Sequence, residues 1–238
     1  MPRRIISLAG GRRGVIALVA ALAGLALIGV AWRAQVSAPQ PHPSGRIDVA
    51  AAAPTADLGR SPSPARSHPL GPSRPVRIAI PAIGVHSAVF PIGKTRTGRL
   101  GVPQPGPRLN QVAWYRRSPA PGQPGPSVLL GHVDSVEGPS VFFRLGDVHP
   151  GDKVRIRRKD GTTVVFTVNA VRDFHKAHFP SRLVYGGADL TTPQLRLITC
   201  SDYVASIHHH IGDQVVFAHL TSVRHPRRAA ASGTRAEE

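Results

Sequence analysis

The stretch KVRIRRKDGTTVVFTVNAV, residues 153–171, decides the fold class of this chain. It holds two runs typical of β-strands, Lys153–Arg158 and Thr163–Val171, and an Asp160-Gly161 turn signal lies between them. Asp-Gly between two such runs favours a tight hairpin turn. The stretch therefore predicts a β-hairpin, with the basic residues beside the turn at its solvated end.

The same sequence pattern continues on both sides of this stretch, from Val76 to Leu220. It consists of short alternating or β-branched runs separated by Gly and Pro. Helical periodicity is scarce. The sequence therefore predicts an all-β fold, and eight strands suit a closed eight-stranded β-barrel with short helices or turns. The other six predicted strands are Val76–Ile80, Val85–Val89, Val112–Tyr115, Ser127–His132, Leu195–Cys200 and Gln214–Leu220.

An uncharged apolar stretch at residues 14–32 predicts one transmembrane helix ahead of the barrel. Arginines concentrate in residues 1–13, so we expect that basic segment to stay in the cytoplasm. The alternative is a cleaved signal peptide ending at Val36-Ser37-Ala38. We favour the anchor, because the apolar stretch is long for a signal peptide and Pro39 would hinder cleavage.

Two further segments lack the large apolar residues that a core requires. Residues 33–75 are rich in Pro, Ala and Ser, which predicts an extended linker between the anchor and the domain at residues 76–222. Residues 223–238 are predicted to form a disordered basic tail.

The formal net charge is +17, but the basic residues are spread along the chain. Few aromatic residues lie among them and no nucleic-acid-binding motif is present, so we expect no nucleic-acid partner. A position near anionic lipids or an anionic cell wall accounts for the charge equally well.

The chain has one cysteine, Cys200, so it forms no intramolecular disulfide. Cys200 ends an apolar run and shares a strand face with Arg196 and Ile198. His132 ends another run, next to Gly131. A buried, inert thiol is the commonest fate of a free cysteine, but a neighbouring imidazole favours the nucleophilic thiolate. Cys200 and His132 are therefore our candidate catalytic pair.

Gly131–Ser135 (GHVDS) and Leu197–Cys200 (LITC) resemble the two signature segments of the sortase family. The resemblance covers roughly Val76 to Leu220 and implies an eight-stranded β-barrel behind an amino-terminal membrane anchor. Six more segments resemble the class F sortases of high-GC Gram-positive bacteria: Ala113–Tyr115, Gly122–Pro126, Val141–Leu145, Pro150–Asp152, Phe179-Pro180 and Val184–Gly186.

The resemblance implies a cysteine transpeptidase whose catalytic domain spans residues 76–222. Cys200 would attack the Thr–Gly amide of a sorting signal resembling Leu-Pro-X-Thr-Gly, forming a thioester, and His132 would transfer protons. The implied partners are surface proteins with a carboxy-terminal sorting signal and an amine acceptor such as a cell-wall precursor. No cofactor is implied. The implied location is the cell membrane, single-pass, with the catalytic domain outside.

One family feature is missing. A sortase places an arginine on the strand after the cysteine loop, and alignment on Asp213 puts Gly212 at that position. Loss of one oxyanion donor typically lowers the rate by about 10²–10³. Arg196 is the nearest substitute that the sequence offers. The departure also favours an alternative, an impaired sortase-fold module that binds peptide or wall polymer.

Two further interpretations follow from short motifs. One is that the chain is another cysteine hydrolase or an L,D-transpeptidase. The L,D-transpeptidase family has His-Gly-Cys near its nucleophile, whereas this chain has Ile198-Thr199-Cys200, which argues against that interpretation. The His208–His210 triplet, with His175 and His178, offers imidazoles for a metal. Successive side chains on a strand point to opposite faces, so at most two of the triplet converge and we expect no metal site. His210 could supply part of the missing positive charge.

Overall fold

The computed structural model describes residues 38–39, 43–45, 70–135, 138–186 and 190–226. The predicted anchor at residues 14–32 lies outside these residues, as do most of the predicted linker and tail. Among the described residues, no helix has the length and apolar character needed to cross a membrane.

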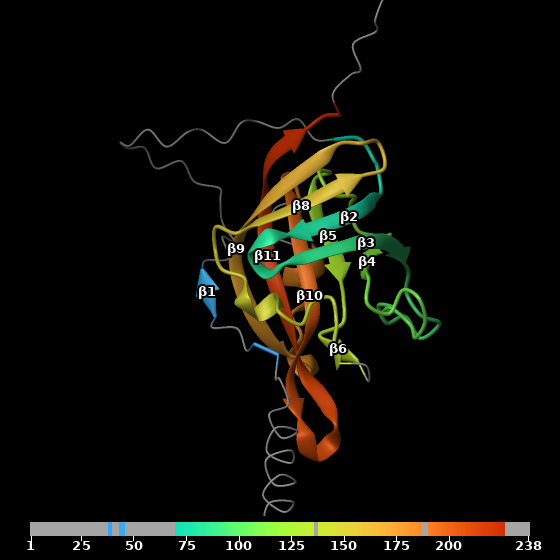
Figure 1. The fold of residues 1–238 in the computed structure, drawn as a ribbon, viewed down its shortest axis with the longest axis vertical. Coiled ribbons are helices and arrows are strands. Elements are labelled where there is room, and N and C mark those ends of the chain that lie inside the picture. The colour runs from blue at the N-terminus through green and yellow to red at the C-terminus, as the bar shows by residue number, and fades with distance from the viewer. Residues whose placement is uncertain (1–37, 40–42, 46–69, 136–137, 187–189, 227–238) are drawn as a thin grey trace, which may run out of the picture. The chain divides into compact units, whose positions relative to one another are not determined.

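Eight strands close into a barrel in the order β9-β11-β10-β5-β4-β3-β2-β8, and pairing of β8 with β9 completes the ring (Figure 1). This confirms the predicted all-β, closed eight-stranded barrel. The strands are β1 Ser44–Gly45, β2 Pro75–Ile80, β3 Val85–Ile92, β4 Val112–Tyr115, β5 Gly125–Leu130, β6 Asp134–Ser135, β7 Gly138–Pro139, β8 Lys153–Arg158, β9 Thr163–His175, β10 Pro193–Val204 and β11 His209–Arg224. The short helical turns are η1 Pro81–Ile83, η2 Leu145–Asp147, η3 Lys176–His178, η4 Arg182–Gly186 and η5 Ala205–Ile207.

The strand ends differ from the predicted ones where pairing continues beyond the apolar run. β10 extends to Val204 and β11 begins at His209, because the two pair antiparallel beyond Cys200 as far as Val204 opposite His209. The predicted strand Ser127–His132 instead ends at Leu130, so His132 lies in the loop that follows β5.

Alternate residues of β10 face two different apolar clusters. Leu195 and Leu197 belong to the cluster that fills the barrel and draws residues from all eight strands. Ile198 belongs to a second cluster, on the outer face of the sheet, which includes Val184 of η4. The segment between β9 and β10 therefore covers the outer face of β10, and residues in phase with Ile198 face that cover.

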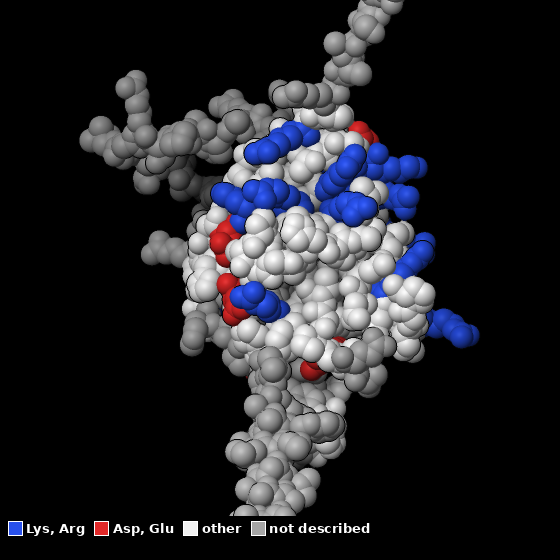
Figure 2. All heavy atoms as spheres, in the orientation of Figure 1, with Lys and Arg blue, Asp and Glu red and all other residues white. Residues whose placement is uncertain are grey.

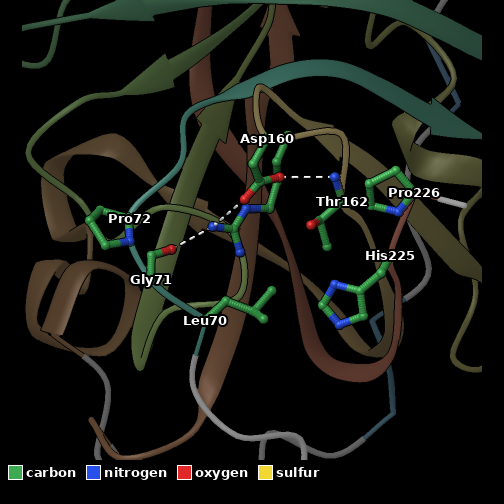
Figure 3. A pocket seen from close by; sticks show the side chains of 8 residues that line it. Leu70, Gly71, Pro72, Asp160, Thr162, His225 and Pro226 are labelled. Carbon is green, nitrogen blue, oxygen red and sulfur yellow. Dashed lines mark hydrogen bonds and ion pairs between the residues drawn. The ribbon is translucent and has the colours of Figure 1, made fainter. Parts of the chain in front are cut away.

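A cavity of about 700 Å³ opens at the end of the barrel where β8 leads into β9 (Figure 3). Arg158 lines it, donates to the carbonyl of Gly71 and pairs with Asp160 at 3.1 Å. Thr162 lines the same cavity just before β9, whereas the other end of β9 pairs beside Cys200. Because β9 has 13 residues, about 40 Å of strand at 3.3 Å per residue separates this cavity from the thiol.

Exposed arginines line the neighbouring strands β8 and β2. Arg155 and Arg157 are exposed on β8, and Arg77, exposed on β2, pairs directly opposite Arg157. Figure 2 shows basic side chains gathered over these strands. Within the described part of the chain, none of these three arginines forms an ion pair. This face therefore presents uncompensated positive charge to the solvent.

Candidate active site

Cys200 lies on the outer face of β10, in phase with Ile198 and directly opposite Asp213 of β11. It is half-buried, so the thiol is not sealed inside the barrel. The apolar run before it anchors the strand, because Leu197 is fully buried in the barrel. Cys200 therefore lies where the sheet's outer face begins to open to solvent.

His132 follows β5, the parallel neighbour of β10. The two strands pair through Leu130 opposite Ile198, and two residues beyond that pair come His132 and Cys200. Two hydrogen bonds extend the alignment, since Gly131 donates its N–H to Ile198 O at 3.2 Å and Thr199 Oγ1 donates to Gly131 O at 2.9 Å. The fold therefore brings the two predicted residues to the same end of adjacent strands.

The His132 ring faces a backbone carbonyl, with Nε2 2.8 Å from Pro103 O. A carbonyl can only accept, so Nε2 carries the proton, and in the neutral ring Nδ1 is the nitrogen that accepts one. Among the contacts of the described residues, there is no hydrogen bond between this ring and Cys200 Sγ. Phe142 holds the loop by donating its N–H to His132 O at 3.0 Å.

Lys176 is a site residue that the sequence did not single out. It is the first residue of η3, and its Nζ lies 3.5 Å from Cys200 Sγ. The same ammonium donates to His210 O at 2.9 Å and lies 3.9 Å from Asp213 Oδ1. Asp134 completes the charged cluster, with Oδ1 3.2 Å from His210 Nε2. A cation therefore faces the sulfur, and two carboxylates lie around it.

Burial raises the pKa of the Cys200 thiol, and the carboxylates of Asp213 and Asp134 raise it further. The ammonium of Lys176 opposes them and lowers this pKa, both by its charge and by its hydrogen bond to the sulfur. Burial also raises the pKa of Asp213. The Cys200 side chain is therefore a thiol at neutral pH, and a base or cation is needed to make thiolate.

The position predicted for an arginine does not face the thiol. Gly212 pairs with Ser201, so a side chain at Gly212 would point to the face opposite Cys200 and overlap Ser201 Oγ. Arg196, the nearest substitute that the sequence offers, shares the face of Cys200 but is buried with its guanidinium 4.6 Å from the Phe217 ring centroid. At about 3.3 Å per residue, Arg196 lies about 13 Å along the strand from Cys200.

The histidines do not converge. His208 Nδ1 lies 3.2 Å from Tyr203 OH, whereas His210 bonds Asp134. His175 caps η3, with its Nδ1 accepting from Ala177 N at 3.2 Å, and its ring packs against that of His178, the centroids being 5.9 Å apart. Among the described residues, no group of three or more metal-ligating side chains is placed to hold an ion.

The sequence carried little signal for Lys176. It stands between His175 and an alanine at the end of a polar run, a pattern that does not differ from an ordinary exposed turn. Pairing of β9 with β11, which sets His175 opposite Gly212, is what brings η3 beside Cys200. This contact is tertiary, so local periodicity could not reveal it.

The family model described as the sortase domain matches residues 78–223. Among solved structures, sortase A from Listeria monocytogenes is 18% identical with a TM-score of 0.48, covering 64% of this chain and 89% of that one. Sortase A from Corynebacterium diphtheriae is 22% identical with a TM-score of 0.48, and the match covers 66% of this chain and 64% of that one. A Clostridium perfringens sortase D5 transpeptidase is 18% identical with a TM-score of 0.45, and the match covers 63% of this chain and 79% of that one. The search of curated proteins found no match.

Proposed function

The chain belongs to the sortase family, and from that premise we propose that it is a cysteine transpeptidase with Cys200 as nucleophile and His132 as acid and base. The observation that carries the proposal is the pairing of β5 with β10, which sets His132 and Cys200 at matching positions of parallel neighbours. A half-buried thiol on an outer sheet face remains within reach of a peptide.

The proposed reaction has two steps that meet at a thioester. Cys200 Sγ gives its proton to His132 Nδ1 as it adds to the Thr–Gly carbonyl of a sorting signal resembling Leu-Pro-X-Thr-Gly. The tetrahedral intermediate then expels the glycine amine, which takes that proton from His132. An incoming amine then attacks the thioester and gives its proton to His132. His132 returns that proton to the departing Cys200 sulfur, so the new amide leaves and the thiol is restored. Protons, bonds and electrons balance without a metal or organic cofactor.

The ring geometry supports this role for His132. Its Nε2–H is held by Pro103 O at 2.8 Å, so Nδ1 is the nitrogen that exchanges the proton. Because the contacts of the described residues include no hydrogen bond between His132 and Cys200, we expect the productive pair to form when substrate enters the site. Catalytic hydrogen bonds often tighten only in the substrate complex.

The proposed substrates are surface proteins with a carboxy-terminal sorting signal, and the proposed acceptor is the amine of a cell-wall precursor. Both follow from the family and from the class F resemblance. Water in place of the amine would give slow hydrolysis.

The proposed location is the cell membrane, with residues 14–32 as the anchor, the N-terminus in the cytoplasm and the catalytic domain outside. The uncompensated arginines of β2 and β8 suit surroundings rich in anionic lipid or wall polymer. A membrane-impermeant maleimide should label Cys200 in intact cells, and the chain should stay with the membrane after carbonate washing. Labelling only after lysis, or release by carbonate, would contradict this topology.

Peptide turnover tests the proposed activity. The full-length chain in detergent is incubated with sorting peptides and triglycine, and products are followed by mass spectrometry. We expect the new Thr–triglycine amide in wild type, none in Cys200→Ala, and a strong loss in His132→Ala. His86→Ala is the matched control, because His86 is an exposed histidine on β3. A Cys200→Ala variant as active as wild type would refute the assignment.

The missing arginine favours a second candidate function, a sortase-fold module that binds peptide or wall polymer without useful turnover. Calorimetry separates the two, since a pure binder gives saturable heat on peptide addition while mass spectrometry finds no cleaved product. Any amide product that depends on Cys200 would remove the pure binding alternative.

A further inference from the structure

Acyl transfer at Cys200 places negative charge first on sulfur and then on the substrate carbonyl oxygen, so the cation nearest the sulfur matters most. Among the described residues, the only lysine or arginine in hydrogen-bond contact with Cys200 Sγ is Lys176, at 3.5 Å. We propose that Lys176 is a catalytic residue whose ammonium stabilises the Cys200 thiolate and the oxyanion that forms from it, in place of an arginine on β11.

The backbone fixes the ammonium in place. Lys176 begins η3 directly after β9, and β9 pairs with β11 through His175 opposite Gly212. Lys176 Nζ also donates to His210 O at 2.9 Å, and this contact orients a side chain that keeps only 33% of its surface exposed. The lysine therefore has fewer arrangements to lose when charge develops on sulfur.

The Lys176 ammonium has enough N–H donors to bind both the sulfur and a developing oxyanion. An ammonium has three N–H donors. Two point at His210 O and Cys200 Sγ, and Asp213 Oδ1 at 3.9 Å lies beyond hydrogen-bond distance. One donor is therefore left for an incoming carbonyl oxygen, as oxyanion stabilisation requires.

The charged groups around the sulfur come from four segments. Asp213 lies beside it on β11, Asp134 comes from β6, Lys176 comes from η3, and His132 follows β5. Asp134 and Asp213 disfavour thiolate, and His210 is bonded to Asp134. Lys176 is thus the group in this cluster that contacts the sulfur and always favours its ionised form near neutral pH.

Other basic residues are placed less well. Arg196 stacks on Phe217 and donates to Gln194 Oε1 at 2.5 Å and to Leu195 O at 3.1 Å, so its guanidinium is engaged away from the thiol. Arg158 lines the cavity at the other end of the barrel.

The thiol itself reports on the proposal, because Cys200 is the one cysteine of the chain and every alkylated molecule is modified there. The rate of alkylation by iodoacetamide is measured against pH for the full-length protein. We expect Lys176→Met to move the midpoint to higher pH, and Lys176→Arg to restore most of the wild-type profile. Lys153→Met is the matched control, since Lys153 is an exposed residue of β8, and should leave the profile unchanged.

An unshifted profile in Lys176→Met, with thermal unfolding like that of wild type, would overturn the proposal. If Lys176→Met fails to fold, Lys176→Gln replaces it, and an unshifted profile there has the same meaning. If Lys176→Arg and Lys176→Met move the midpoint of the alkylation profile to higher pH by the same amount, the shape of the side chain rather than its charge matters. That result also refutes the proposal.

The oxyanion half of the inference rests on the proposed transpeptidase function and has its own readout. In peptide turnover, Lys176→Met should lower kcat/KM by about 10²–10³, the usual effect of removing one oxyanion donor. Equal kcat/KM in the variant would overturn this half. A wild type that shows the Lys176-dependent alkylation profile but cleaves no peptide would sink the transpeptidase proposal and still support thiolate stabilisation by Lys176.

Discussion

Thr199→Val should loosen the connection that aligns the segments carrying Cys200 and His132. Thr199 is 4% exposed, and its hydroxyl donates to Gly131 O at 2.9 Å, which joins β10, the strand that carries Cys200, to the loop after β5 that carries His132. Valine has nearly the same shape but cannot donate, so Gly131 O loses its partner in a buried position. Leaving a buried acceptor unsatisfied costs about 1–3 kcal/mol. For a domain of this size, Tm should fall by about 2–4 °C for each kcal/mol.

Differential scanning calorimetry of the full-length chain measures the effect, and peptide turnover is followed in parallel. Thr163→Val is the matched control, because the described residues include no hydrogen-bond partner for the Thr163 hydroxyl. We expect Thr199→Val to lower both Tm and kcat/KM, and the control to change neither. A Tm for Thr199→Val within a degree of the control would refute the reasoning, since the hydrogen bond would then contribute nothing to the alignment.

Three further predictions test the barrel and the site. Burial raises the pKa of Asp173 from 3.8 to about 6, so the wild type should lose stability as pH rises through this range. Asp173→Asn should reduce that loss in thermal scans at each pH, with the remainder coming from groups such as Asp213 whose pKa burial also raises, and an unchanged slope would contradict the prediction. Gly212→Arg should lower Tm without raising turnover, because its side chain would meet Ser201 on the face away from the thiol; a large gain in acylation would show that the register is wrong. In Gly131→Ala the new methyl would lie 2.9 Å from Phe142 Cδ2, so kcat/KM should fall as the loop shifts, and wild-type kinetics would exclude the close approach.

The sequence predicted the barrel well because β-branched runs and turn signals are local properties. The hairpin at residues 153–171 appears as β8 and β9, which pair antiparallel. Register irregularities could not be predicted in the same way. Between Phe217 and Ala218 the β9–β11 register shifts, and this changes which residues of β9 face the interior. Such shifts depend on the partner strand and leave no mark on apolar alternation.

The candidate site was predictable only in part. The motifs pointed to Cys200 and His132, and the parallel pairing of β5 and β10 sets them at the same end of adjacent strands, while their role stays a prediction. Lys176 was missed because its place depends on the pairing of β9 with β11. The expected arginine position at Gly212 also needed the register, since one residue along a strand reverses the face of a side chain. Local sequence patterns do not reveal contacts between segments that are distant in the sequence.

The most direct test of the account is the acyl-enzyme itself. The full-length chain is mixed with a sorting peptide, quenched in acid within seconds, and analysed by intact-mass and peptide-mapping mass spectrometry. The account predicts a hydroxylamine-labile adduct, carrying the peptide up to its threonine, on the peptide that contains Cys200 and absent from Cys200→Ala. A cleaved sorting peptide with no adduct in wild type, or an adduct that persists in Cys200→Ala, would contradict it.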